Sequence, residues 1–292
     1  MERRTSLDRR TFLAAAAGSL ALPAVPAVSL QGDGKQAPPK RKLRQSVCRW
    51  IYDRIPLEEF CDKVAAMGIT AIDLLTPNDW HIPKKHGLVC SMAYGFKSME
   101  IHKGLNRVEN HDAFVEESER LLPRIAEAGI PNMIVFSGNR DGQDDATGIK
   151  NCVIGLQRIA KSAEKHGVTI CLEYLNSKVD HRDYAFDHMK YGLDVCKQVA
   201  SPRVKILYDI YHAQIMEGDV IRTITDHIDW IGHFHTGGVP GRNDIDDTQE
   251  LNYPAVCRAI LATKYDGFVA HEFIPKKDPL ETLARCVKLC DV

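Results

Sequence analysis

Four side chains that can bind a metal ion or move a proton stand at the ends of apolar runs in the second half of the chain. The runs "TICLE", "KILYD", "WIGHFH" and "GFVAHE" end at Glu173, Asp209, His235 and Glu272. Successive members are 36, 26 and 37 residues apart, close to the length of one strand-plus-helix unit. Buried strands more often give way to the Gly, Asn or Pro of a turn, so the repetition indicates one shared site.

The residue types indicate a divalent metal ion. Three carboxylates and an imidazole form an oxygen-rich set that suits Mn²⁺, Mg²⁺ or Co²⁺ better than a thiolate-seeking ion. Without a cation, three neighbouring carboxylates would repel one another. Simpler interpretations exist for single residues, since Asp209 could be a helix N-cap and His233 a core histidine. Four coincidences at successive strand ends favour a site for one metal ion, with Mn²⁺ as the first choice and Mg²⁺, Co²⁺ or Zn²⁺ as alternatives.

The elements that must position these residues can be read from the apolar pattern. Helical patterns that close on Gly68, Gly129 and Gly167 separate the apolar runs. Eight units in about 250 residues predict an α/β fold, a single (β/α)8 TIM barrel, over residues 44–292. A nucleotide-binding GxGxxG or GxxxxGK[ST] follows none of the expected strands. The expected strands are 46–51, 69–75, 88–92, 132–136, 169–172, 204–208, 230–235 and 267–271.

Three further residues are candidates for substrate binding. His212 lies one helical turn after Asp209, so both can point into the barrel mouth. Arg242, in the loop "TGGVPGRND", can clamp an oxygen-rich substrate with paired hydrogen bonds. Trp80, in "TPNDWHIP" after the second expected strand, could close over a substrate as a lid, although ordinary packing at the rim explains it equally well.

The first residues have the pattern of an export signal. Residues 1–27 contain the pair Arg9 and Arg10, then "TFL" and an apolar run of small residues, which resembles a twin-arginine signal peptide. The polar, Pro- and Lys-containing residues 28–43 are typical of a linker. We therefore expect export, with the periplasm as destination, and no stable membrane anchor in the mature protein.

Composition limits the classes of partner. Of 292 residues 44% are hydrophobic and 26% charged, and the formal net charge of −1 gives no basic stripe for nucleic acid. The nine cysteines show no CxxC spacing, so we expect buried thiols more than disulfides. The expected partner is a small molecule, a sugar or hydroxy-keto acid, and a homo-oligomer is compatible with the sequence.

The ordered motifs resemble a known family. "KGLNRVENHD", "LEYLN", "YDIYHAQ", "GHFHTGGVPGR", "ELNYPAV" and "HEF" are similar to the hydroxypyruvate isomerase family within the xylose-isomerase-like barrel superfamily. The resemblance implies a metal held by Glu173, Asp209, His235 and Glu272, with the two glutamates as acid and base and with His212 and Arg242 on the substrate. His235 is a departure, because hydroxypyruvate isomerases often carry Gln there, whereas ketose 3-epimerase relatives carry His.

Proton transfer beside a carbonyl, through a cis-enediolate, is the chemistry that this set of residues predicts. Return of the proton to the neighbouring carbon is isomerisation, as from hydroxypyruvate to tartronate semialdehyde. Return to the opposite face is epimerisation, as in a ketose 3-epimerase, and loss of a β-substituent makes a keto-sugar lyase or dehydratase. An endonuclease IV-like phosphodiesterase would need more histidines and a basic groove. A non-catalytic, metal-dependent sugar-binding protein is the alternative of another class.

Overall fold

The computed structural model describes residues 42–95 and 97–292, and the expected leader and most of the expected linker lie outside these residues. All eight expected strands are present in this part of the chain, and the first is displaced to begin at Arg44. They are β1 Arg44–Cys48, β2 Ala71–Asp73, β3 Val89–Cys90, β4 Asn132–Val135, β5 Thr169–Glu173, β6 Val204–Asp209, β7 Ile231–Thr236 and β8 Phe268–His271.

The strands form one parallel sheet in the order β3-β2-β1-β8-β7-β6-β5-β4. The two outer strands meet through Ala93, which forms a parallel bridge with Met133; the N–H of Ala93 donates to the carbonyl of Asn132 at 2.8 Å. The sheet thereby closes on itself, and the expected (β/α)8 TIM barrel is confirmed.

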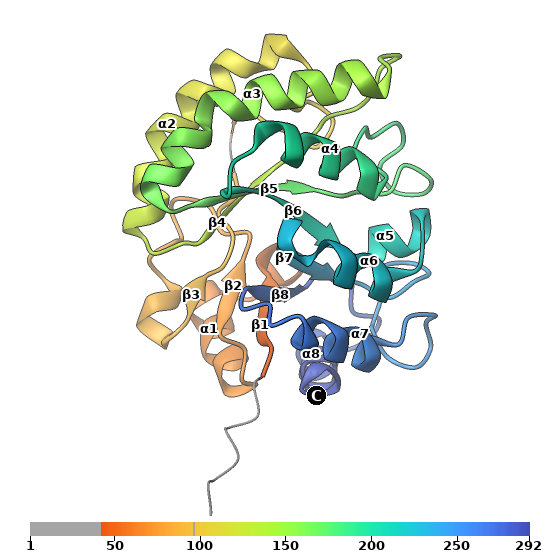
Figure 1. Ribbon diagram of the computed structural model, residues 1–292. Helices are drawn as coiled ribbons and strands as arrows, with labels where there is room; N and C mark the ends of the chain where they lie inside the picture. The colour runs from red at the N-terminus through yellow and green to blue at the C-terminus, as the bar shows by residue number, and fades with distance from the viewer. Residues whose placement is uncertain (1–41, 96) are drawn as a thin grey trace, which may run out of the picture. The chain divides into compact units, whose positions relative to one another are not determined.

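Helices surround the strands in the order expected for this barrel (Figure 1). Gly167 ends the long helix after β4 with a φ of 70°, the left-handed conformation that a glycine adopts without strain. The α-helices are α1 Leu57–Ala66, α2 His111–Glu127, α3 Asp145–His166, α4 Met189–Val199, α5 Ile210–Met216, α6 Val220–His227, α7 Tyr253–Ala262 and α8 Pro279–Cys290. Short 3-10 helices are η1 Arg49–Tyr52, η2 Pro83–His86, η3 Val108–Asn110 and η4 Ile228–Trp230.

Strand register determines which side chains meet at the mouth. Asp209 pairs with His235 across β6 and β7, and Glu173 pairs with Leu207 across β5 and β6. Thr236, the last residue of β7, pairs with His271, the last residue of β8. Because parallel strands point the same way, their carboxyl ends lie together and the residues that end them share one face.

The core is continuous from the barrel interior to the packed helices. All nine cysteines are buried and free, which confirms the expectation of buried thiols.

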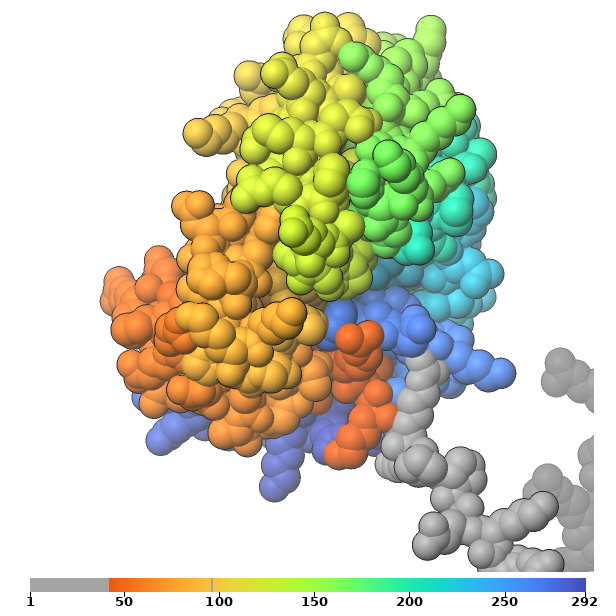
Figure 2. Space-filling model, turned by 90° about the vertical axis from the view of Figure 1, so that its left-hand side faces the viewer, coloured from red at the N-terminus to blue at the C-terminus, as the bar shows by residue number. Residues whose placement is uncertain are grey.

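Figure 2 shows one side of the molecule, where the orange residues of the first units lie below the yellow-green helix α2. Among the described residues, the helices are all too short or too polar to cross a membrane.

Candidate metal and catalytic site

The structure brings the four predicted ligands together at the carboxyl ends of the strands. Glu173 ends β5, Asp209 ends β6, His235 lies on β7, and Glu272 directly follows β8. One ligand atom from each residue lies within 4.8 Å of the others. The Nδ1 atom of His235 is 3.3 Å from Glu173 Oε1 and 2.8 Å from Glu272 Oε2. The sequence therefore identified a real cluster of buried side chains.

Asp209 combines the two interpretations that its position allowed. Its Oδ1 atom accepts hydrogen bonds from the backbone N–H groups of Tyr211 at 2.8 Å and His212 at 3.3 Å, and thus caps the start of α5. Its Oδ2 atom faces the cluster instead and is buried. A single carboxylate therefore begins a helix and presents an oxygen to the site.

The unsatisfied atoms in the cluster fit a bound cation. Within the described residues, Asp209 Oδ2 and His235 Nδ1 are buried and have no hydrogen-bond partner. The short contact between His235 Nδ1 and Glu272 does not have the alignment of a hydrogen bond. Buried polar atoms without partners are costly. Three carboxylate oxygens and one imidazole nitrogen are suitable donors for a divalent ion such as Mn²⁺, so these residues fit the metal that the sequence predicted.

The electrostatics of the cluster also indicate too little positive charge. Burial raises the pKa of Glu173 above its ordinary value, and burial raises the pKa of Asp209 to about 7 despite the nearby Arg242. The pKa of Glu272 is lowered instead. Although burial acts to raise it, Arg242 and His235 hold this pKa well below its usual range. Two of the three carboxyl groups are thus left without enough compensating charge, which a divalent cation would supply.

Arg242 lies in the site, but its guanidinium faces the protein's own carboxylates. It donates to Glu272 Oε2 at 2.5 Å and lies 3.6 Å from Asp209 Oδ2. The guanidinium also lies over the rings of Trp50 and Tyr211, 5.7 and 5.6 Å from their centroids. Arg242 therefore orients Glu272 and lines the mouth at the same time.

His212 is fully buried beneath the mouth. Its Nε2 atom is 3.5 Å from Asp209 Oδ2, and its Nδ1 atom is 2.6 Å from the amide nitrogen of Asn176. The ring of His181 packs against it at 5.3 Å between centroids. His181, which the sequence gave little reason to choose, lines the cavity, whereas His212 lies behind it.

A cavity of about 460 Å³ opens above the cluster. Glu173, Glu272 and Arg242 lie on its polar side. Most of its apolar lining comes from the first half of the chain. The residues concerned are Trp50, Leu74, Tyr94, Ile101, Ile134 and Phe136.

The structure does not bring Trp80 into this cavity. The indole N–H of Trp80 donates to the carbonyl of Leu75 at 2.8 Å, which holds the ring in a separate pocket beside Arg124 of α2. Trp50 occupies the expected aromatic position instead, and its indole N–H donates to Glu272 Oε1 at 2.8 Å. Residues 46–51, which include Trp50, were expected to form a strand, so this role of Trp50 was not predicted. In the structure the chain turns into η1 at Arg49.

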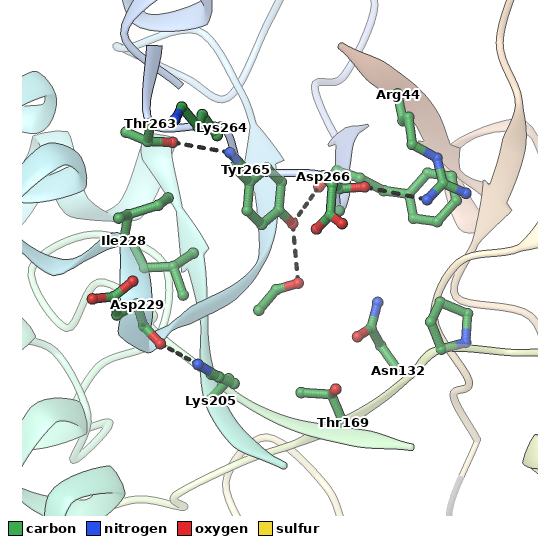
Figure 3. Close-up of a pocket in the computed structure, with 15 residues that line it drawn as sticks. Arg44, Asn132, Thr169, Lys205, Ile228, Asp229, Thr263, Lys264, Tyr265 and Asp266 are labelled. Atoms are coloured by element: carbon green, nitrogen blue, oxygen red, sulfur yellow. Dashed lines mark hydrogen bonds between the residues drawn. The ribbon is translucent and has the colours of Figure 1, made fainter. Parts of the chain in front are cut away.

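A second cavity, of about 680 Å³, lies at the opposite end of the barrel (Figure 3). It is lined by residues at the starts of strands, such as Arg44, Asn132 and Thr169. Two of its cationic groups bind backbone carbonyls: Lys205 binds that of Asp229, and Arg44 binds that of Asp266. Among the described residues, the groups that could hold a metal ion lie at the other end, which is the end where chemistry is expected in this fold.

Comparison with known sequences gives a consistent result. The model of the xylose isomerase-like TIM barrel family matches residues 61–290. The 2-oxo-tetronate isomerase of Cupriavidus necator is 36% identical over 117 residues, which are 40% of this chain and 44% of that protein. The 2-oxo-tetronate isomerase of Pectobacterium atrosepticum is 24% identical over 77% of this chain and 89% of its own length. A putative hydroxypyruvate isomerase of Homo sapiens is 26% identical over 62% and 68%.

Solved structures show the same fold. An AP endonuclease, family 2, from Brucella melitensis is 23% identical and superimposes with a TM-score of 0.74 over 83% of this chain and 98% of that one. The 3-keto-D-glucoside 4-epimerase of E. coli is 19% identical, with a TM-score of 0.71 over 85% and 99%.

Proposed function

The chain belongs to the xylose isomerase-like TIM barrel family, and we propose that it is a divalent-metal-dependent isomerase of a small hydroxy-carbonyl compound. The relatives named 2-oxo-tetronate isomerase and hydroxypyruvate isomerase support a 2-oxo acid that carries a neighbouring hydroxyl group. The proposed reaction is of the type that converts hydroxypyruvate to tartronate semialdehyde.

One observation carries the proposal: two glutamates on the same cavity are held in different surroundings. Glu272 is fixed by Trp50 and Arg242, and its pKa is low because Arg242 and His235 outweigh burial. Glu173 is 3.3 Å from His235, and burial raises its pKa. Two carboxyl groups that line one cavity and are held by different partners are placed to act as an acid and base pair.

The reaction requires only proton movements. One glutamate removes a proton from the carbon that carries the hydroxyl group, and the electron pair of that C–H bond forms a double bond to the carbonyl carbon. The other glutamate supplies a proton to the former carbonyl carbon, and the hydroxyl proton passes to the former carbonyl oxygen. No atom is gained or lost, so the product is an isomer of the substrate.

Glu173, Asp209, His235 and Glu272 are the residues that would hold the metal. When bound, the divalent ion supplies Lewis-acid polarisation of the substrate oxygens and balances the three carboxylates. Arg242 keeps one Glu272 oxygen oriented, and Trp50 keeps the other. The apolar side chains that line the cavity reduce the number of water molecules around the carbon that exchanges its proton.

The cavity favours a second candidate, a ketose 3-epimerase or keto-sugar lyase. Its volume of about 460 Å³ is large for a three-carbon acid, and Trp50, Tyr94 and Phe136 offer the aromatic faces on which a sugar ring can lie. His235 also supports this candidate, because ketose 3-epimerase relatives carry a histidine at the corresponding position. The chemistry would be the same proton removal with a different fate of the carbanion.

Deuterium incorporation tests these functions together. Mature protein loaded with Mn²⁺ is incubated in D₂O with hydroxypyruvate, free ketoses and 3-keto-glycosides, beside an EDTA-treated control. We expect metal-dependent uptake of deuterium at carbon, and the product then identifies an isomerase, an epimerase or a lyase. Bound Mn²⁺ without exchange on any of these compounds would contradict the enzyme proposal and favour a sugar-binding protein.

A further inference from the structure

A buried carboxylate that the sequence pattern did not reveal lies behind His235. Asp73 ends β2, whereas the four clustered residues lie at the ends of β5 to β8. Its Oδ2 atom is 2.9 Å from His235 Nε2, with the alignment of a hydrogen bond. His235 therefore has one ring nitrogen on Asp73 and the other directed at the ligand cluster.

The other contacts of Asp73 hold it rigidly. The hydroxyl of Ser91 donates to Oδ1, and His233 Nε2 is 3.2 Å from the same oxygen. The thiol of Cys48 donates to Oδ2 at 3.7 Å. Asp73, Ser91, His233 and Cys48 all have no exposed surface. An ionised carboxylate at such a depth is costly unless its oxygens are occupied, so these contacts keep it in place.

We propose that Asp73 is a positioning residue that fixes His235 as the Nε2–H tautomer, so that the Nδ1 lone pair is available to the metal. The inference rests on the metal site of the proposed function, and it assigns a role to a residue outside the four ligands. In the neutral imidazole only one nitrogen carries a proton, and the carboxylate that accepts this proton decides which one it is. A histidine whose ring and tautomer are fixed in this way binds the metal more tightly, because it need not first stop rotating or change its tautomer.

One rival reading of the same residues must be distinguished. Cys48, Asp73 and His235 also lie within 4.8 Å of one another and could form a second metal site. The aligned contact of 2.9 Å between His235 Nε2 and Asp73 Oδ2 favours a proton between these atoms rather than a metal ion. The two readings differ in stoichiometry, with one bound ion per chain in our proposal and two in the rival.

The first experiment titrates Mn²⁺ into the metal-free protein and follows free Mn²⁺ by electron paramagnetic resonance. For Asp73→Asn we expect the dissociation constant to rise about 10- to 100-fold, because the amide can direct an N–H at His235 Nε2 and stabilise the wrong tautomer. Asp187→Asn is the matched control, since Asp187 is buried and pairs with Arg140 at 2.8 Å, away from the ligands. An unchanged Mn²⁺ affinity in folded Asp73→Asn, or two ions per wild-type chain, would overturn the proposal.

The second experiment needs no substitution of Asp73 and no metal. Nitrogen-15 NMR of histidine-labelled, metal-free wild type reads which nitrogen of His235 keeps its proton, at a pH where the ring is neutral; His235→Gln assigns the signal. We expect a protonated Nε2. A protonated Nδ1 would overturn the proposal even if Asp73→Asn does not fold. If wild type binds no Mn²⁺ but carries the Nε2–H tautomer, the metal function fails while the positioning by Asp73 stands.

Discussion

The two halves of the barrel contribute different kinds of residue to the site. In the second half, β5, β6, β7 and β8 have five, six, six and four residues, and each supplies or directly precedes a candidate metal ligand. In the first half, β1 and β4 have five and four residues, β2 and β3 only three and two, and this half supplies most of the apolar lining of the cavity. Long strand ladders hold charged atoms in place, whereas a wall that recognises shape can be built from loops and short helices.

Asp73, like Trp50, joins the halves. It lies on one of the shortest strands, yet it holds the imidazole that β7 presents to the site. A division into a chemical half and a substrate half makes separate predictions for changes on each side.

Removing the acid or base from the chemical half should abolish turnover and leave the fold intact. For Glu173→Gln we expect kcat to fall by about 10²- to 10⁴-fold, because an amide neither takes nor gives the proton. Deuterium exchange in D₂O measures this, and circular dichroism checks the fold. Glu250→Gln, at a more exposed glutamate whose carboxylate accepts from Gln214, is the control and should keep wild-type activity. Full exchange in Glu173→Gln would refute the assignment.

Metal removal should loosen one half more than the other. Relative to protein with Mn²⁺ at 100 times its dissociation constant, the metal-free protein should lose about 2.7 kcal/mol of unfolding free energy. Hydrogen exchange read by mass spectrometry should show lost protection at the ends of β5 to β8 and in the first turn of α5. Equal loss in β2 and β3 would contradict the division between the halves.

A change in the apolar lining should affect large substrates only. Tyr94 is 42% exposed and lines the cavity, so Tyr94→Ala removes a face on which a sugar ring can lie. We expect KM for a keto-sugar to rise by about tenfold or less, with kcat little changed, and KM for hydroxypyruvate to stay constant. Tyr94→Phe keeps the ring and is the control. The same rise for both substrates would show that the lining does not select by size.

The smallest effect concerns a surface contact in the first half. His86 bridges Glu58 at 2.7 Å and Asp62 at 2.6 Å, and both carboxylates raise its pKa. A raised pKa in the folded state means that the contact stabilises fully below the unfolded value of about 6.5 and is lost as pH rises through the folded value. The Tm difference between wild type and His86→Gln should therefore shrink above about pH 6.5. Activity should not change, and a Tm difference that is constant with pH would contradict this account.

The sequence was sufficient to predict the cluster of four residues and insufficient to predict the residues around it. Glu173, Asp209, His235 and Glu272 follow apolar runs at barrel-like spacing, and strand register then makes them neighbours. Asp73 was missed because it stands inside the apolar run "AIDLL", where the end of a three-residue strand leaves no periodic signal.

The aromatic residues show a different limit. Trp80 and Trp50 both lie shortly after or at the end of an expected strand, and only the local turn decides which one reaches the mouth. The indole N–H of Trp80 donates to the carbonyl of Leu75. The turn at η1 instead places Trp50 where its indole N–H donates to Glu272. Loop conformation depends on such single hydrogen bonds, which composition and periodicity do not encode.

Because its two carboxylate oxygens have different roles, Asp209 is hard to replace in evolution or design. Asparagine would keep the oxygen that caps α5 and forfeit the charge offered to the site, whereas glutamate would keep the charge on an arm too long for the cap. Only aspartate meets both demands. A screen for stability and a screen for activity should therefore both reject changes at this residue, so that neither property can be optimised there at the expense of the other.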